Sequence, residues 1–318
     1  MNSETSSGLT IAITGGTGFV GKHLIRQLTA DGYAVRALVR KPNSDNNKTE
    51  VTWIEGDLNN KLALADLMSG ADVVVHAAGA IKALSRAEFF DVNCGGTEAV
   101  IDAALIGGVA RFVLVSTLAA REPSLSHYAA SKRAAELVLE KNGDRITPII
   151  LRPPAIYGPG DSEIAPLFQM VANGFFLAPN QKDARVSLIH VSDVVTAIQA
   201  CFECYQADQP FEIDDGFVDG YRWSDISNVA GLAVQRSPKF IPLPALLIYL
   251  VGLFGTIRGL LTRKSTILTH VKVKELLHTD WRARGPVPPG WKPVWTLEKG
   301  FTEAVHWYSS QNILKSYF

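Results

Sequence analysis

Cysteine and net charge are both scarce in this chain. Only three of its 318 residues are cysteine, at Cys94, Cys201 and Cys204. Three cysteines are too few for a disulfide framework in a protein of this size, and they favour a reducing, cytoplasmic setting. Lys plus Arg and Asp plus Glu number 31 each, so the whole chain has no net field that would attract nucleic acid or an acidic membrane surface. We therefore expect no nucleic-acid partner.

A metal-binding arrangement of cysteines is also missing. Cys201 and Cys204 form one C-x-x-C pair, but no second pair of ligands follows it. Both lie in an apolar helical pattern from Val194 to Tyr205, where packing in the core is preferred over a metal or redox site. The sequence therefore predicts no metal site.

No segment has the pattern of a secretory signal or of a well-specified membrane span. Residues 1–8 are polar and Ser-rich, and we expect a flexible leader there. Residues 240–257 carry no charge and reach the lower limit for a span, but Pro and Gly interrupt them and Lys or Arg flank both ends. For residues 240–261 three interpretations stay open: a span, a helix that contacts a membrane surface or another subunit, and a buried or pocket-covering helix, which is preferred.

Apolar runs alternate with helical patterns through about the first half of the chain. The expected strands are Thr10–Thr14, Ala34–Val39, Val51–Glu55, Val73–Ala77, Phe112–Ser116 and Ile149–Leu151. They are rich in Val, Ile and Leu without polar alternation, as strands buried on both faces are. The pattern predicts βαβ units and an α/β fold with a doubly wound parallel sheet of the Rossmann type.

A breaker-rich segment, Pro153 to Gly160, ends this regular alternation. We therefore expect a dinucleotide-binding domain over residues 9–152. A smaller substrate-binding lobe is expected within residues 153–318, with some segments returning to the sheet.

A glycine-rich turn stands at the first expected strand-to-helix junction. Residues 14–21 are Thr-Gly-Gly-Thr-Gly-Phe-Val-Gly. The spacing of Gly15, Gly18 and Gly21 allows a tight turn, the approach of a pyrophosphate to bare backbone, and close packing of helix on strand. The N-terminus of the following helix then faces the phosphates. A glycine turn without a ligand is the alternative, but the context favours a dinucleotide site.

Tyr128 and Lys132 lie four residues apart, on one face of an expected helix. A free tyrosine titrates near pH 10, and a cation beside it favours the phenolate, so this pair can make a usable acid or base. The alternative is a chance pair on the surface. The preceding strand ends in Ser116 and Thr117, whose hydroxyls fall at the sheet edge where open parallel sheets bind ligands.

Several further motifs accompany the glycine turn and the Tyr/Lys pair. They are H-A-A-G at 76–79, V-N-C-G-G-T at 92–97, V-S-T at 115–117, Y-A-A-S-K at 128–132, L-R-P-P-A-I-Y-G-P-G at 151–160 and I-H-V-S-D-V-V at 189–195. In this order, over nearly the whole chain, they resemble the extended short-chain dehydrogenases/reductases. That family includes nucleotide-sugar epimerases, dihydroflavonol reductases and 3β-hydroxysteroid dehydrogenases.

The resemblance implies a catalytic Ser/Thr-Tyr-Lys set. Tyr128 would exchange the proton, Lys132 would also hold the nicotinamide ribose, and Thr117 would polarise the substrate oxygen, with Ser116 as the alternative. A homodimer is expected by the same analogy. Including the basic pair Arg40 and Lys41, the expected cofactor-binding residues are Gly15, Thr17, Gly18, Phe19, Val20, Arg40, Lys41, Asp57, Leu58, Ala77, Ala78, Gly79, Asn93, Tyr128, Lys132, Pro153 and Ile156. The alternative for Asp57, the implied adenine contact, is a helix cap.

The end of the second expected strand bears on the choice of dinucleotide. NAD enzymes usually present an Asp or Glu there to the ribose 2′-hydroxyl, about twenty residues after the glycines. This chain presents Arg40 and Lys41 instead, and a guanidinium suits a 2′-phosphate. NADP is therefore preferred, with NAD as the alternative, and a solvated basic turn is the interpretation without a ligand.

The second half bears on the substrate class. Nucleotide-sugar members of the resembled family usually carry an Arg followed closely by an acid, and Arg185 to His190 lacks that acid. An apolar small-molecule substrate is preferred, because the uncharged residues 240–257 fall where the resembled family builds its variable substrate-binding lobe. We expect a reductase or dehydrogenase acting on a secondary alcohol or ketone. A nucleotide-sugar epimerase or dehydratase, and a non-catalytic dinucleotide-binding sensor or assembly protein, are the alternatives. His190 is expected to be structural rather than a substrate contact.

Overall fold

The computed structural model describes residues 8–42, 50–204, 207–262 and 272–314. The leader expected at residues 1–8 lies outside this range except for Gly8. The chain forms two compact units. The first comprises Met1–Arg152, Val195–Phe211 and Gly285–Trp291, and the second comprises Pro153–Val194, Glu212–Arg284 and Lys292–Phe318.

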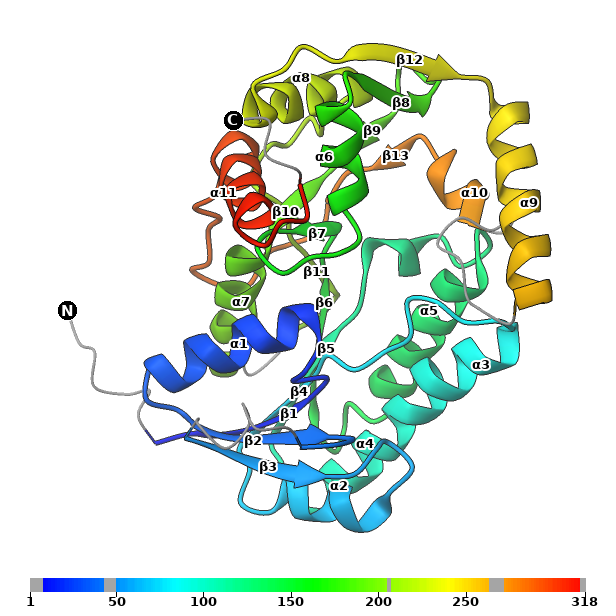
Figure 1. Cartoon of the computed structure of the whole chain (residues 1–318). Coiled ribbons are helices and arrows are strands. Elements are labelled where there is room, and N and C mark those ends of the chain that lie inside the picture. Colours follow the sequence, from blue (N-terminus) through cyan, green and yellow to red (C-terminus); the bar gives the residue numbers. More distant parts are fainter. Residues whose placement is uncertain (1–7, 43–49, 205–206, 263–271, 315–318) are drawn as a thin grey trace. The chain divides into compact units, whose positions relative to one another are not determined.

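A seven-stranded sheet in the order β11-β6-β5-β4-β1-β2-β3 is the centre of the first unit (Figure 1). The pairs from β6 to β3 are all parallel. The strand bounds are β1 Thr10–Thr14, β2 Ala34–Val39, β3 Val51–Glu55, β4 Val73–His76, β5 Arg111–Val115, β6 Thr147–Arg152 and β11 Phe211–Glu212. The first three agree with the predicted bounds, the next three differ by one or two residues, and β11 was not predicted. The predicted α/β fold with a parallel sheet is thus confirmed.

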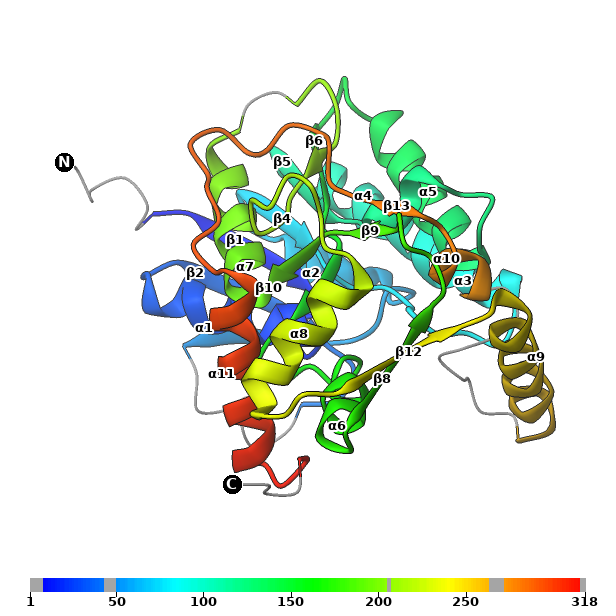
Figure 2. The same ribbon diagram turned by 90° about the horizontal axis from the view of Figure 1, so that it is seen from above.

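Helices cover both faces of this sheet, as Figures 1 and 2 show. Their bounds are α1 Phe19–Ala30, α2 Lys61–Met68, α3 Arg86–Phe90, α4 Gly96–Ile106 and α5 His127–Glu140, while α7, Val191–Ala200, belongs partly to each unit. On one face, apolar side chains of α2, α4 and α5 pack against the strands in one buried cluster that includes Leu64, Ile101 and Leu139. Burying such side chains contributes roughly 1.5–3 kcal/mol each.

The order of the strands reverses beside β1, which has β2 on one side and β4 on the other. In open α/β sheets, ligands bind at the carboxyl ends of the strands next to such a switch point. The glycine turn follows β1 directly. The fold therefore places this turn where a dinucleotide is expected.

The second unit is built from short strands and helices. Its elements are β7 Ala155–Tyr157, α6 Ala165–Ala172, β8 Phe175–Pro179, β9 Arg185–Val186, β10 Leu188–His190, α8 Trp223–Val234, β12 Lys239–Leu243, α9 Ala245–Thr262, α10 Lys272–Leu276, β13 Asp280–Trp281 and α11 Leu297–Ser310. In its core, Phe168 and Tyr157 contact Phe301 edge to face, each with ring centroids 5.0 Å apart. Figure 2 shows α8 beside α11, which share this core.

The uncharged stretch at residues 240–257 divides between β12 and α9. No helix among the described residues is long and apolar enough to cross a membrane. The preferred interpretation is a buried or pocket-covering helix, and its first half is wrong: most of the described apolar side chains of α9 are exposed, whereas Ile248 and Gly252 are buried. The sequence pattern could not show this, because a helix that is apolar all round is usually buried. That the helix covers a pocket stays a prediction.

The cysteine pair packs in the core, as predicted. Cys201 and Cys204 are buried and form no disulfide. Cys201 lies in a short 3₁₀ turn after α7 and donates from Sγ to the Ala197 carbonyl oxygen at 3.2 Å. Tyr205, the last residue of the predicted helical pattern, lies outside the described residues.

Candidate active site

The glycine turn needs its glycines for space as well as for backbone conformation. Gly15 has φ +76°, and a Cβ on it would lie 2.6 Å from the Ala78 amide nitrogen, so β1 and the segment after β4 touch here. A Cβ on Gly21 would lie 2.2 Å from the Gly15 carbonyl oxygen, which lets α1 pack on the turn. The two positions therefore bring backbone to backbone, as a dinucleotide turn requires.

The outer side of the turn is open. Thr17 and Gly18 are exposed, and a Cβ on Gly18 would meet only the Gly15 carbonyl oxygen, at 3.2 Å. No side chain caps the N-terminus of α1, where Phe19 and Val20 are half-buried. Uncapped amides at a helix N-terminus bind phosphate oxygens. The turn therefore fits the pyrophosphate of a dinucleotide.

A buried chain of hydrogen bonds holds this turn against the neighbouring strand. Thr97 Oγ1 donates to the Asn93 carbonyl oxygen at 2.6 Å and faces His76 Nε2 at 3.0 Å, while His76 Nδ1 faces Thr14 Oγ1 at 2.6 Å. Since Thr97 has used its proton, His76 donates from Nε2 and accepts at Nδ1. Burial, and to a smaller extent the Lys132 ammonium, lowers the pKa of His76 to about 3. The imidazole is therefore neutral and structural.

Asn93 links the segment after β4 to helix α5. It lies in a π-helical turn, Asp91–Gly95, and is buried. Its Oδ1 accepts from the Ala80 amide at 2.7 Å, and its Nδ2 donates to the Ala80 carbonyl at 3.0 Å and to Ser131 Oγ at 2.9 Å. Asn93, predicted to bind the cofactor, therefore uses its side chain to hold two elements in place.

Helix α5 carries the predicted acid/base pair. Ser126 caps it, accepting from the Ala129 amide at 3.0 Å. Tyr128, in the first turn, is half-buried, and its ring packs beside Phe89 with centroids 6.1 Å apart. Lys132, one turn later, is buried and donates from Nζ to the Val115 carbonyl oxygen at 2.8 Å. Burial lowers the pKa of Lys132 to about 8, although the Glu136 carboxylate acts to raise it.

Gly79 brings the edge of β4 up to this lysine. A Cβ on Gly79 would lie 3.8 Å from Lys132 Nζ and 3.1 Å from Asn93 Oδ1. Gly79 is exposed, and Ala77 and Ala78 before it are half-buried. The predicted cofactor-binding residues after β4 thus lie close to a buried ammonium, which can donate to hydroxyl oxygens of a ribose.

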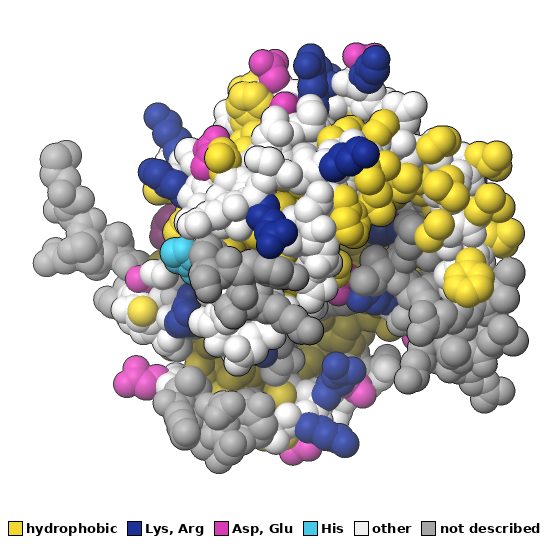
Figure 3. Space-filling model, turned by 45° about the horizontal axis from the view of Figure 1, so that its top comes forward, with side chains coloured by type: hydrophobic (Ala, Val, Ile, Leu, Met, Phe, Trp, Pro, Cys, Tyr) yellow, Lys and Arg dark blue, Asp and Glu magenta, His cyan; other side chains and the backbone are white. Residues whose placement is uncertain are grey.

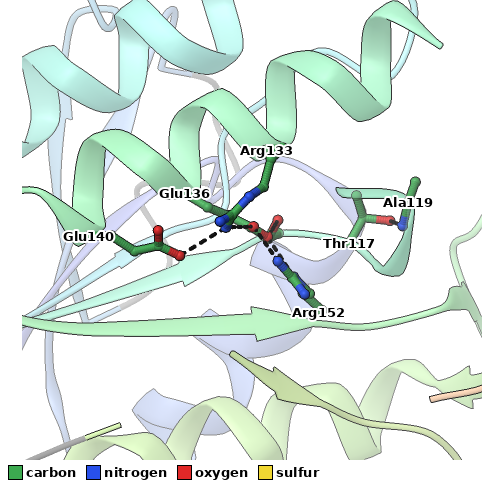
Figure 4. A network of polar contacts seen from close by, with 7 residues as sticks. Thr117, Ala119, Arg133, Glu136, Glu140 and Arg152 are labelled. Atoms are coloured by element: carbon green, nitrogen blue, oxygen red, sulfur yellow. Dashed lines mark hydrogen bonds and ion pairs between the residues drawn. The ribbon is translucent and has the colours of Figure 1, made fainter. Parts of the chain in front are cut away.

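The two candidate hydroxyls after β5 have different surroundings. Ser116 is buried, and its Oγ donates to Glu136 Oε1 at 2.5 Å. Thr117 is half-buried, and its Oγ1 accepts from the Ala119 amide at 3.3 Å, a long bond that caps a 3₁₀ turn (Figure 4). The Ser116 proton is therefore committed to a carboxylate, whereas the Thr117 hydroxyl keeps its own proton for donation.

Glu136 is the centre of a polar network that sequence reasoning missed (Figure 4). Arg152, at the end of β6, donates to it from Nε at 2.9 Å and from Nη2 at 2.6 Å, and Arg133 Nη1 donates at 2.9 Å. Burial acts to raise the pKa of Glu136, but Arg152 and the other donors outweigh it and lower the pKa. A signal was present in the sequence: Glu136 follows Lys132 by four residues on the same helix face.

The residues predicted to select the dinucleotide follow β2, and the residue predicted to contact the adenine follows β3. Arg40 and Lys41 follow β2 and are exposed. Asp57 is exposed after β3, and its Oδ1 accepts from the Asn59 amide at 2.9 Å. The alternative role of Asp57 as a helix cap is wrong, because Asn60 caps α2 by accepting from the Ala63 amide at 3.1 Å.

The other predicted residues differ in their surroundings. Leu58 packs against the core of the first unit, where a Cβ on Gly96 would lie 2.6 Å from its Cδ1. Pro153 and Ile156 belong to the second unit, Ile156 in β7 beside β10. His190 is buried there, stacks on Trp295 with centroids 4.1 Å apart and lies 2.8 Å from Glu303 Oε2. These contacts support its structural interpretation.

Comparison with known proteins agrees with this geometry. Residues 11–213 match the family described as "NAD dependent epimerase/dehydratase family". The chain is 41% identical over 301 residues to a ceramide reductase of Caulobacter vibrioides, covering 94% of each chain. It is 27% identical over 332 residues to a UDP-glucose 4-epimerase of Vibrio cholerae, covering 95% of this chain and 96% of the relative.

A solved structure shares the fold. MoeE5 in complex with UDP-glucuronic acid and NAD superimposes with a TM-score of 0.71 at 21% identity, covering 96% of this chain and 100% of that chain. At this identity the likeness concerns the fold alone. With the family match and the ceramide reductase relative, it shows that the chain belongs to the NAD-dependent epimerase/dehydratase family, as an NAD(P)-linked oxidoreductase of the extended short-chain dehydrogenase/reductase type.

Proposed function

We propose that this protein reduces a ketone on a long-chain lipid of the ceramide class, with NADPH as the preferred reductant. The observation that carries the proposal is the 41% identity to a ceramide reductase over 94% of both chains. The presence of Thr117, Tyr128 and Lys132 at the motif positions supports catalysis rather than dinucleotide binding alone.

Each side chain of this set has one task in the proposal. Tyr128 donates the proton that the substrate oxygen takes up, and the buried Lys132 ammonium favours the resulting phenolate. Thr117 donates a hydrogen bond to the substrate oxygen. Its preference over Ser116 rests on the short bond from Ser116 to Glu136, which commits that hydroxyl elsewhere. A bound nicotinamide dinucleotide supplies the hydride chemistry.

The preference for NADP rests on charge at the end of β2. Arg40 and Lys41 are exposed there, and Arg40 stands directly after the last strand residue, Val39. A guanidinium forms paired hydrogen bonds with phosphate oxygens. In our proposal these two residues hold the ribose 2′-phosphate, while Gly15, Gly18 and the N-terminus of α1 hold the pyrophosphate.

A homodimer and a cytoplasmic setting complete the proposal. The dimer is proposed by analogy with the family. The setting is supported by the small number of cysteines, three in 318 residues, which is too few for a disulfide framework.

The test is a turnover assay with purified protein. NADPH oxidation is followed with a short-chain ceramide analogue that carries a ketone, and conversion of UDP-glucose is measured in parallel. We expect reduction of the lipid ketone, and its loss by at least about 100-fold in Tyr128→Phe, with NADPH affinity retained. Tyr33→Phe is the matched control, since the Tyr33 ring is half-buried like that of Tyr128 and packs against Phe202.

Two outcomes would overturn the proposal. Conversion of the UDP-sugar without net consumption of NADPH would assign an epimerase, as in the Vibrio cholerae relative. Full turnover by Tyr128→Phe would remove Tyr128 from its role.

A further inference from the structure

Helix α9 presents an apolar surface to solvent. Seven of its side chains are between 41% and 72% exposed: Leu246, Leu247, Tyr249, Leu250, Val251, Leu253 and Phe254. Figure 3 shows hydrophobic side chains gathered on the side where α9 lies in Figure 1. Contiguous apolar patches of this kind are rare on proteins that contact only water, and they mark sites of protein or membrane interaction.

Over residues 245–256, the part of α9 whose side chains are described, the exposed side chains extend around most of the helix. Ile248 and Gly252, one turn apart, are buried there, and Gly255 and Thr256 beside them are half-buried. The seven exposed side chains point away from this buried pair, to the other sides of the helix. Such a helix needs a wide apolar medium around it, whereas a groove-shaped partner covers only one stripe.

The sequence on both sides of α9 carries charges of one sign, up to Glu275 on α10, which pairs with Lys272 at 2.6 Å. Between Ile226 and Lys274 the sequence has seven Lys or Arg and no Asp or Glu, although the whole chain has 31 of each kind. These basic residues are Arg236, Lys239, Arg258, Arg263, Lys264, Lys272 and Lys274. Lys239, at the start of β12, and Lys274, on α10, are exposed. A net charge of zero over the chain thus conceals a basic segment centred on an apolar helix.

We propose that α9 inserts into the surface of a membrane that contains anionic lipids, with the exposed Lys239 and Lys274 side chains at the headgroups. Apolar side chains flanked by basic ones are what an interfacial helix requires. A second copy of this chain is a less suitable occupant, because it would carry the same excess of positive charge to the interface. The inference is compatible with a lipid substrate but does not depend on the proposed reaction.

The test is flotation of the full-length protein with vesicles of phosphatidylcholine alone and of phosphatidylcholine mixed with phosphatidylglycerol. We expect binding to the mixed vesicles, weakened by added salt. Leu250→Gln/Phe254→Gln should lower this binding at least about tenfold, since apolar burial is lost. Lys239→Gln/Lys274→Gln should lower it about thirtyfold.

Leu62→Gln/Ile106→Gln is the matched control, because these side chains on the first unit are 84% and 85% exposed. It should bind as the unaltered protein does. Equal binding by the α9 variant, no binding to either vesicle, or binding indifferent to phosphatidylglycerol would overturn the proposal. Light scattering measures the oligomeric state of the same variants. The proposal would also be overturned if the α9 substitutions changed the protein from a dimer to a monomer and did nothing else. Turnover of the short-chain ketone is measured separately in detergent-free buffer without vesicles. A protein that reduces this ketone but does not bind vesicles would contradict the membrane proposal and leave the proposed reaction standing.

Discussion

Replacing Glu136 by Gln should destabilise the first unit strongly, whereas the same change one turn later should not. Glu136 and Glu140 lie on one face of α5 and share Arg133, which donates to each at 2.9 Å. The Glu136 side chain is 0% exposed and also binds Arg152, itself 11% exposed, whereas Glu140 is 37% exposed. The two variants therefore make the same Glu-to-Gln change, once at a buried and once at a solvent-exposed carboxylate.

The magnitude follows from burial. Removing one partner of a buried ion pair costs about 3–5 kcal/mol, because the other charge is left in a poorly solvated place. Gln keeps one acceptor oxygen, so we expect about 3 kcal/mol for Glu136→Gln. Exposed pairs contribute about 0–1 kcal/mol, which is the expectation for Glu140→Gln.

Urea denaturation followed by circular dichroism measures both. With a urea dependence of about 1–3 kcal/mol per M, Glu136→Gln should lower the midpoint by about 1 M or more. The pKa of Glu136 lies below its ordinary value of 4.5, so its contribution is present above that value and is lost as the pH falls through the lowered pKa. The difference between the unaltered protein and Glu136→Gln should therefore shrink in acid. Equal midpoints for Glu136→Gln and Glu140→Gln at neutral pH would refute the reasoning.

Three further outcomes are expected. Because burial lowers the pKa of Lys132 to about 8, its ammonium is lost on the alkaline side, so turnover should fall as the pH rises through about 8; any activity retained by Lys132→Arg should lack this fall. Arg40→Ala/Lys41→Ala should weaken NADPH binding about tenfold or more and leave NADH binding unchanged in a fluorescence titration; equal losses for both would contradict the 2′-phosphate assignment. Thr97→Val removes the acceptor of His76 Nε2 and should lower the free energy of unfolding by about 1–3 kcal/mol, measured by urea denaturation.

Local patterns in the sequence determined much of the first unit. The strands β1, β2 and β3 could be placed to the residue, because strands buried on both faces are continuous apolar runs with clear ends. The glycine turn and the pair Tyr128 and Lys132 were also visible, since their spacing along the chain directly sets their geometry.

Contacts between distant residues were decided only by the tertiary structure. The His76 imidazole meets Thr14, 62 residues away, and Arg152 at the end of β6 binds Glu136 on α5, 16 residues away, which no local spacing encodes. The bond from Ser116 to Glu136 likewise distinguishes Ser116 from Thr117, two hydroxyls that are equivalent in the sequence.

Helix α9 shows that the sequence alone also leaves open which surfaces are exposed. Its apolar composition was plain in the sequence, but a buried and an exposed helix can have the same composition. Only the structure shows that most of the described side chains of α9 are exposed, around a buried pair, Ile248 and Gly252. The sequence by itself therefore determined the fold of the first unit and the chemistry of its motifs, because both depend on short-range spacing. The tertiary structure decided which polar groups are committed to partners and which surface is left exposed, because both depend on what the rest of the chain brings alongside.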